Sequence, residues 1–287
     1  MFTGRVKSHR CGITEILCAS RAVFRQPGWE ERGKKRRLPC PQSQDTEWQE
    51  LSVWDLERIE QEAQRKAADS LCRSMRRART NVRDYAFNTP MHWFVTLTLD
   101  KATVDRYDGE AVVKKLSTWL DNQVRRRGLA YVLVPERHKD GAIHFHGLIN
   151  DAVDVVDSGT LVPPGGGKPR RPRSRRQRNE WIAQGGHVVY NLPGWRFGFT
   201  TAMELYGDYA AAVGYICKYI GKDPQKVGGR WYYSGGKLGR PDVEYLNLNV
   251  EDLEAAGAFS WTAETLAGVR FASAIFGPDG QFTKSGK

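Results

Sequence analysis

The sequence predicts an α+β fold, because strand-like and helix-like segments follow one another along the chain. Residues 93–99 read WFVTLTL and residues 142–149 read AIHFHGLI, and both alternate side chains in the manner of strands. Between them, residues 109–127 place apolar side chains three and four positions apart, as in a helix with one buried face. The chain has 287 residues, 40% of them hydrophobic, which suffices for one sizeable domain with extensions or for two small domains.

The remaining elements are predicted from local spacing and composition. Apolar residues recur at helical spacing from about 50 to 86. A further helix is expected over 209–220, with Asp208 as its N-cap and Gly221 at its end. Short β-rich segments add strands at 131–134, 197–205 and 230–234.

Composition divides the chain into four parts. We expect residues 1–47 to be a basic, poorly ordered arm and residues 48–90 a basic helical segment. Residues 91–250 form the main domain, and residues 251–287 a C-terminal helix and tail. Within the main domain, residues 157–180 are rich in arginine, proline and glycine and cannot bury a core, so a disordered insertion is expected there.

The positive charge indicates a polyanionic partner. Lysine and arginine number 44 against 33 acidic residues, a net charge of +11, and nucleic acid is the simplest partner of that kind. Arginines gather in the second half of the first helix and in the insertion, where they are either solvated surfaces or contacts to DNA phosphates. The candidate DNA-binding residues are Arg73, Arg76, Arg77, Arg79, Arg170, Arg171, Arg173, Arg175, Arg176 and Arg178.

Several other classes lack their sequence signatures. The chain has no apolar run long enough to span a membrane, and its N-terminus lacks the apolar core of a signal peptide. The five cysteines include no CxxC pair, which favours free thiols, so we expect a cytoplasmic protein. No G-x-x-x-x-G-K-[ST] loop is present, so the sequence gives no indication of an ATP motor.

Two histidines in the segment 142–149 form a candidate metal site. His144 and His146 are two residues apart, so both imidazoles of a strand would point to one side and converge on one ion. Glu136, at the end of the preceding strand, is the best third ligand, and its hard carboxylate suits Mg²⁺ or Mn²⁺. His138 is the alternative ligand. Each residue also has an ordinary explanation, since a His-x-His pair in a strand is often incidental.

Two tyrosines of the helix 209–220 are candidate nucleophiles. Tyr215 and Tyr219 are four residues apart on one helix face, and each has a lysine three residues further on, Lys218 and Lys222. A free phenol has a pKa near 10, so attack on a phosphodiester needs positive charge close by. The four residues are therefore candidate catalytic groups, although such a tyrosine pair more often only packs.

These motifs occur in the order of a known family. The chain resembles the HUH (histidine–hydrophobic–histidine) endonucleases. Within them it is most similar to the rolling-circle replication initiators of small single-stranded DNA phages, filamentous and isometric, and of related plasmids. The matching segments are residues 94–98 (FVTLT), 144–146 (HFH) and 215–222 (YICKYIGK), with further similarity over 74–88 and 233–241. The resemblance covers about residues 70–245.

The resemblance implies a central antiparallel β-sheet flanked by helices, with the histidines on a middle strand and the tyrosine helix facing them. It implies site-specific nicking of one DNA strand at a replication origin. One tyrosine becomes linked to the 5′ phosphate, the free 3′-OH primes synthesis, and the second tyrosine rejoins ends at termination. Lys218 and Lys222 would lower the phenol pKa or bind the phosphate.

The same resemblance implies the partners. These are single-stranded or supercoiled origin DNA together with a host helicase and polymerase, because the sequence has no motor motif of its own. The expected location is the cytoplasm of a bacterial host.

Two alternatives stay open at this point. A relaxase or transposase would use the same chemistry, although relaxases usually carry three histidines and an N-terminal tyrosine. A non-catalytic protein that binds RNA or single strands through a β-sheet and basic arms would explain the charge and the aromatic content. It gives no reason for the placement of the glutamate, histidines, tyrosines and lysines.

Overall fold

Two compact units make up the part of the chain that the computed structural model describes, which comprises residues 1–26, 53–205, 207, 209–222, 225–255, 261–265 and 268–282. The central unit contains His9–Cys11 and Met75–Pro241. The terminal unit contains Met1–Ser8, Gly12–Ser74 and Asp242–Lys287. Each unit is built on an antiparallel sheet accompanied by helices, so the predicted α+β class is confirmed.

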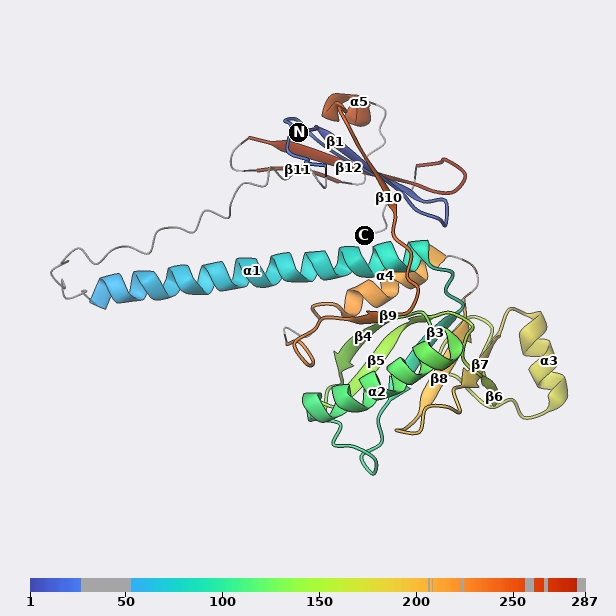
Figure 1. The fold of residues 1–287 in the computed structure, drawn as a ribbon. Coiled ribbons are helices and arrows are strands. Elements are labelled where there is room, and N and C mark those ends of the chain that lie inside the picture. Colours follow the sequence, from blue (N-terminus) through green and yellow to red (C-terminus); the bar gives the residue numbers. More distant parts are fainter. Residues whose placement is uncertain are drawn as a thin grey trace. The chain divides into compact units, whose positions relative to one another are not determined.

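A seven-stranded antiparallel sheet forms the middle of the central unit (Figure 1). Its strand order is β6-β7-β8-β3-β5-β4-β9, so the histidine strand β5 lies in the interior of the sheet, as expected. The strands are β3 (Trp93–Thr98), β4 (Tyr131–Arg137), β5 (Ile143–Ile149), β6 (Val156–Val162), β7 (His187–Asn191), β8 (Thr200–Glu204) and β9 (Tyr233–Gly235). All five predicted strands are present, with the last one shifted a few residues toward the C-terminus.

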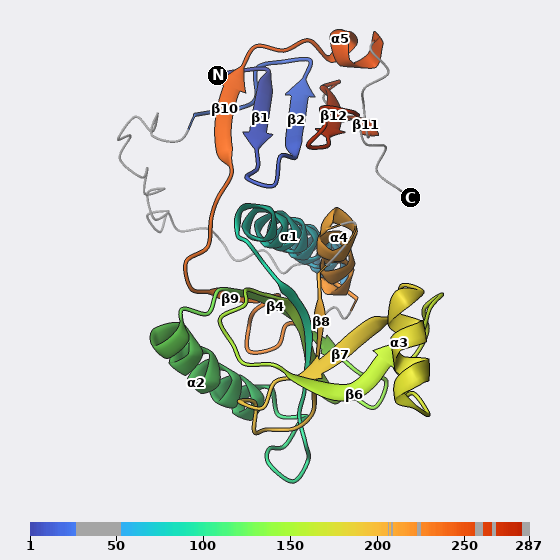
Figure 2. The same ribbon diagram turned by 90° about the vertical axis from the view of Figure 1, so that its right-hand side faces the viewer.

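Helices cover both faces of this sheet (Figure 2). α2 (Gly109–Arg127) lies on one face, and α4 (Tyr209–Tyr219) lies on the other beside the C-terminal part of α1 (Val53–Asn88). The helices predicted at 50–86, 109–127 and 209–220 are therefore confirmed. None of the described helices is long and apolar enough to cross a membrane.

Local sequence explains where α2 and α4 begin and end. The Asp108 side chain accepts hydrogen bonds from the first backbone N–H groups of α2, and Gly128 ends that helix with a left-handed φ of 74°. α4 buries Val213 and Ile216 completely, and Gly221 follows it with a φ of 86°. The expected cap Asp208 lies outside the described residues.

The main hydrophobic core lies between the sheet and α2. Alternate residues of β3 are buried there, together with one side of α2. Because side chains alternate along a strand, the intervening residues of β3 and β5 project from the opposite face, on the side of α4. That face is where the chemically active residue types occur.

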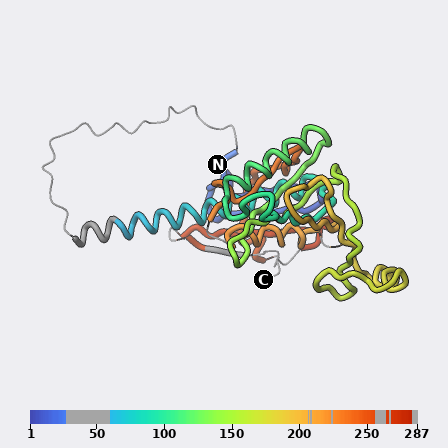
Figure 3. The backbone as a smooth tube through the Cα atoms, turned by 90° about the horizontal axis from the view of Figure 1, so that it is seen from below, coloured from blue at the N-terminus to red at the C-terminus, as the bar shows by residue number. Residues whose placement is uncertain are grey.

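The basic insertion is ordered, which corrects the expectation of disorder over 157–180. β6 pairs with β7, and α3 (Arg175–Ala183) follows, so this segment extends the edge of the sheet (Figure 3). Ser174 caps α3 by accepting a hydrogen bond from the Gln177 backbone, and Leu161 is fully buried. The composition hid these elements because backbone pairing with β7, rather than an apolar face of its own, stabilises β6.

The terminal unit is a five-stranded antiparallel sheet formed from both ends of the chain. Its strand order is β10-β1-β2-β12-β11. The strands are β1 (Gly4–Ser8), β2 (Thr14–Ala19), β10 (Asp242–Leu246), β11 (Trp261–Glu264) and β12 (Arg270–Phe276). A short helix, α5 (Val250–Ala255), packs on β12, where Val250 joins a small core with Cys18 and Ala272.

Two expectations for the chain ends are therefore wrong where the structure describes them. Residues 4–8 and 14–19 are strands rather than a poorly ordered arm, and residues 270–276 are a strand rather than a tail. The rest of the expected arm, residues 27–47, lies outside the described residues. The strands escaped detection because each is short and finds its partner at the other end of the chain.

Candidate active site

The register of the central sheet gathers the predicted metal ligands on the face toward α4. His144 and His146 of β5 stand opposite Thr98 and Thr96 of β3, and on the other side His144 stands opposite Glu136 of β4. Residues opposite one another in an antiparallel pair point to the same face. The sequence spacing alone placed the two histidines together, and the register adds the carboxylate.

Two threonine hydroxyls hold the histidine rings. Thr96 Oγ1 lies 3.1 Å from His146 Nδ1, and Thr98 Oγ1 lies 3.1 Å from His144 Nδ1. A hydroxyl can donate or accept, so it fixes the ring in either tautomer. With Nδ1 engaged, Nε2 is the nitrogen of each ring that remains for a ligand.

Glu136 connects the histidine strand to the segment after α4. Its Oε2 lies 2.8 Å from His146 Nε2, and its Oε1 accepts a hydrogen bond from Lys222 Nζ. The side chains of Glu136 and His146 are largely buried, whereas Lys222 is 62% exposed. Glu136 and Lys222 line a pocket of about 430 Å³ together with Tyr219 and the β4–β5 turn.

α4 presents both tyrosines to this face. The Tyr219 ring stacks on His146, with ring centroids 4.5 Å apart and planes inclined by 12°. Tyr219 donates a hydrogen bond of 2.7 Å to the Tyr215 hydroxyl. Tyr215 packs on Phe94 of β3 at 5.7 Å and is 47% exposed, so its hydroxyl group is reached by both Tyr219 and solvent.

The electrostatic environment keeps the Tyr219 phenol protonated. Burial raises the pKa of Tyr219, and the hydrogen bond to Tyr215 raises it further. Lys222 lies 5.5 Å from the centroid of the Tyr219 ring, but its hydrogen bond with Glu136 engages the ammonium and raises the pKa of Lys222. The exposed side chain of Lys218 is in the last turn of α4. In this arrangement the expected lowering of the phenol pKa by the lysines is therefore not met.

The donor set of the three predicted ligands fits a divalent cation. Burial lowers the pKa of both His144 and His146, which favours the neutral imidazoles that metals require. Glu136 contributes a hard oxygen ligand. Within the described residues, the ligand atoms of the three do not all lie within 4.8 Å of one another. Glu136 and His146 are in contact, whereas the His144 ring lies against His138, with centroids 4.4 Å apart.

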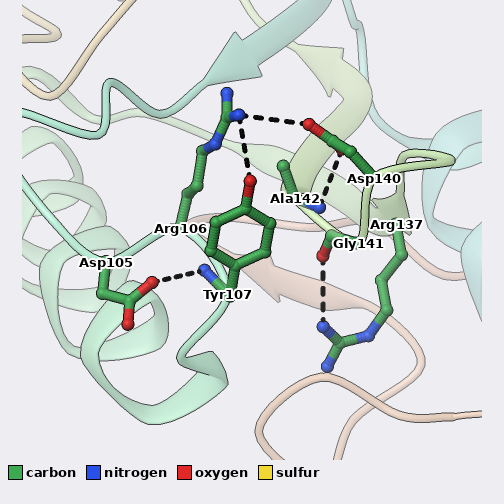
Figure 4. A network of polar contacts seen from close by, with 7 residues as sticks. All are labelled: Asp105, Arg106, Tyr107, Arg137, Asp140, Gly141 and Ala142. Carbon is green, nitrogen blue, oxygen red and sulfur yellow. Dashed lines mark hydrogen bonds and ion pairs between the residues drawn. The ribbon is translucent and has the colours of Figure 1, made fainter.

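A polar network fixes the β4–β5 turn beside the pocket (Figure 4). Asp140 accepts a hydrogen bond of 3.1 Å from the Ala142 backbone and one of 3.1 Å from Arg106. Arg106 also donates to the Tyr107 hydroxyl at 3.1 Å. The Ala142 hydrogen bond lowers the pKa of Asp140, so its charge is maintained and the turn stays tied to the loop before α2.

The predicted DNA-binding arginines fall into different structural situations. Arg73, Arg76 and Arg77 are exposed on α1, and Arg170, Arg171, Arg173 and Arg175 are exposed around the start of α3. Arg176 and Arg178 form ion pairs with Glu180 at 2.9 Å and Asp157 at 2.5 Å. Arg79 donates to the Ile220 carbonyl from Nε at 3.2 Å and from the terminal guanidinium nitrogen at 2.6 Å. It therefore holds the end of α4.

Thr96, Thr98 and Phe94 are the site residues to which sequence reasoning gave no role. Their signal was the strand alternation itself, because all three have the same parity in β3 and so share the histidine face. Which face they share with the histidines depends on the register between β3 and β5, and that register is set by contacts fifty residues apart in the chain.

The fold and the site define a basic α+β protein whose central sheet presents a carboxylate and two histidines to a tyrosine-bearing helix. Residues 92–224 match the model of a family described as replication-associated protein ORF2, and the match spans a little under half of the 287 residues. The match contains every candidate catalytic and metal-ligating residue and supports a role in DNA replication. No curated protein and no solved structure matches the chain.

Proposed function

We propose that this chain initiates replication by nicking one DNA strand through a tyrosine. The observation that carries the proposal is the stack of Tyr219 on His146, whose Nε2 is also in contact with Glu136. A phenol, a donor set for a divalent cation and the ammonium of Lys222 are thereby close together at one pocket. Phosphodiester cleavage by a tyrosine needs these three groups, because it requires a nucleophile and neutralised phosphate charge.

The transfer step is an exchange of phosphoester bonds. The Tyr219 phenolic oxygen attacks the phosphorus atom, the new bond links the 5′ phosphate to the tyrosine, and the bond to the 3′ oxygen breaks. The leaving 3′ oxygen takes up a proton and becomes the free 3′-OH. The phenolic proton leaves along the hydrogen bond to Tyr215, which is half exposed and passes a proton to water.

Glu136, His144 and His146 are the residues that would hold a divalent ion, Mg²⁺ or Mn²⁺. When bound there, the ion neutralises charge on the phosphate oxygens. Thr96 and Thr98 orient the imidazoles, and Lys222 supplies a positive charge beside Glu136 and Tyr219.

The pairing of the two hydroxyls supports a second transfer. Tyr215 and Tyr219 oxygens are 2.7 Å apart, so both reach the same phosphate region. In this proposal Tyr219 acts first, because it stacks directly on His146, and Tyr215 attacks the regenerated junction and rejoins ends at termination. The DNA partner is a single-stranded or supercoiled origin in a bacterial cytoplasm, with unwinding and synthesis by a host helicase and polymerase.

A covalent adduct tests the proposal. The chain is incubated with Mn²⁺ and end-labelled single-stranded oligonucleotides of randomised sequence, and the products are resolved on a denaturing gel. A 3′ label should move with the protein and a 5′ label should not, because the 5′ phosphate of the downstream fragment becomes bound. The double variant Tyr215→Phe with Tyr219→Phe is the control and should give no adduct while it still binds DNA.

The same assay separates the alternatives. Binding without any adduct, at every Mn²⁺ and Mg²⁺ concentration tried, would reject the enzyme and favour a non-catalytic single-strand-binding protein. An adduct whose 5′ label is retained would reject the proposed polarity of cleavage.

A further inference from the structure

Phe199 is the most exposed large hydrophobic side chain in the described part of the chain, with 73% of its surface accessible. It stands directly before β8, which is the strand next to β3 in the central sheet. Single exposed apolar residues are common on protein surfaces. The position of this one relative to the candidate active site gives it significance.

Phe199 belongs to the same row of residues as the histidines. The Thr98 backbone N–H donates to the Phe199 carbonyl at 2.8 Å, which continues the register in which Leu97 stands opposite Thr200. Leu97 and Thr200 are buried on the α2 side, so Phe199 and Thr98 share the other face. Thr98 in turn stands opposite His144. The row therefore runs from Phe199 on the β8 side across β3 to the histidine strand.

The backbone around Phe199 is fixed tightly to β3. Gly198 has a φ of 154°, and a Cβ at this position would lie 2.3 Å from the Thr98 carbonyl oxygen. Only glycine permits this approach. On the other side of Gly198, the Phe197 carbonyl accepts a hydrogen bond of 2.7 Å from the Asp100 backbone. The exposed ring is thus carried by an ordered backbone, which reduces the entropy lost when a ligand binds to it.

The surroundings of the ring favour a nucleic-acid base over a protein partner. Its neighbours on this face include Thr98 and Thr201, which are polar, so the ring is an isolated apolar point. Protein partners usually require a contiguous apolar patch of several hundred Å². A base requires a single aromatic face, because each base offers one π surface for stacking.

From this geometry we infer that Phe199 is a stacking platform for an unpaired base next to the scissile phosphate. The inference rests on the proposed nicking function and adds a contact that positions the single strand. Neighbouring strands are about 4.8 Å apart, so Phe199 lies roughly 10 Å from His144 across β3. A strand whose phosphate enters the site therefore places a flanking base over the ring. Since stacking tolerates every base, the contact positions the strand without reading its sequence.

The test measures binding apart from chemistry, in the full chain with Tyr215→Phe and Tyr219→Phe. Two further variants form a matched pair at the platform: Phe199→Leu keeps an apolar side chain without a π surface, and Phe199→Trp keeps the π surface. The probes are a short oligothymidine, for affinity, and the same strand with 2-aminopurine placed at each position in turn. Stacking quenches 2-aminopurine fluorescence, which a purely structural role of Phe199 would not reproduce at one position only.

We expect Phe199→Leu to weaken oligothymidine binding about tenfold, which corresponds to about 1.4 kcal/mol, and Phe199→Trp to restore it. The quenching at one position should disappear in the leucine variant and return with tryptophan. Equal affinity and unchanged quenching in the leucine variant would overturn the platform and leave the nicking proposal intact. Loss of the covalent adduct in the parent chain, with Phe199-dependent stacking preserved, would overturn the nicking proposal alone.

Discussion

At the scale of single residues, the threonines of β3 determine how the histidines are presented. Thr96 and Thr98 each contact one Nδ1 atom. Removing such an outer partner of a metal-binding histidine typically weakens metal affinity 10- to 100-fold. We therefore expect Thr96→Val and Thr98→Val each to weaken Mn²⁺ binding by about one order of magnitude or more, as measured by calorimetric titration.

Thr201→Val is the matched control for both threonine variants. Thr201 stands opposite Thr96 on β8, and valine keeps the β-branched shape while removing the hydroxyl. Its Mn²⁺ affinity should equal that of the unmodified chain. Equal losses in all three variants would mean that the sheet surface, and not the histidine contacts, governs binding.

The two tyrosines should differ in kinetics. Tyr219 stacks on His146, whereas Tyr215 lies against Phe94 and reaches the site through its hydroxyl. We expect Tyr219→Phe to slow the first adduct about 100-fold, Tyr215→Phe to slow it about tenfold or less, and the double variant to form none. Time courses on denaturing gels, with peptide mapping of the adduct, measure this order. A larger loss from Tyr215→Phe would reverse the assigned roles.

Sequence spacing at this scale identified the residue types but not their contacts. The i and i+2 histidines and the i and i+4 tyrosines were found because strand and helix periods fix which side chains share a face. The contact of Lys222 with Glu136 joins residues 86 positions apart. No local period predicts such a pair, so the raised phenol pKa could not be anticipated either.

At the scale of elements, Arg79 ties α1 to the end of α4. Its guanidinium makes two hydrogen bonds to the Ile220 carbonyl, one residue beyond the last turn that carries Tyr219. Arg79→Ala should lower the free energy of unfolding by about 1–2 kcal/mol and slow adduct formation, because the Tyr219 ring loses its fixed position. Denaturant midpoints and adduct rates measure the two effects. Arg76→Ala, an exposed position one turn earlier, should change neither.

The arginines of the insertion should contribute unequally to DNA binding. Arg176 and Arg178 are already paired with carboxylates, whereas Arg170, Arg171, Arg173 and Arg175 are exposed. Each lost phosphate contact reduces the slope of log affinity against log salt by about 0.7–0.9. Neutralising the four exposed arginines should therefore flatten the salt dependence by about two to three, and neutralising the paired two by less than one. Equal slopes in both variants would make the insertion a spacer.

Element prediction succeeded where a segment buries a face of its own. α2 and α4 were predicted from their apolar stripes and their glycine ends, and β3 and β5 from alternation. β6 and β12 were missed because backbone pairing with distant or weakly apolar segments stabilises them. Propensity describes a residue's immediate neighbours, whereas sheet pairing depends on the partner strand.

At the scale of the whole molecule, buried tyrosines should make the central unit sensitive to alkali. Burial raises the pKa of Tyr233 to about 12, and the Tyr233 hydroxyl donates to the Val227 carbonyl at 2.7 Å. The unfolded chain ionises near pH 10, so this stabilisation is complete below about pH 10 and is lost as the pH rises toward about 12. The loss should be on the order of 1–2 kcal/mol.

Denaturant unfolding at about pH 8 and about pH 11 measures this loss. Tyr233→Phe should be less stable at the lower pH, because the hydrogen bond is gone, but should lose less stability between the two values. Tyr107→Phe, which removes a hydroxyl from a half-exposed ring, is the control. An identical pH dependence in Tyr233→Phe and the unmodified chain would contradict the assignment.

The pairing of the first strands with the last has a consequence for how the protein is made. In the terminal sheet, Gly4 of β1 pairs with Leu246 of β10, and β2 pairs with β12. A ribosome adding about 5–20 residues per second needs roughly 12–50 seconds to synthesise the chain between Gly4 and Leu246. Throughout that interval β1 and β2 have exposed edges with no partner strand, while the central unit can already fold. Nascent chains of this protein should therefore depend on chaperones at their N-terminus until translation is nearly complete.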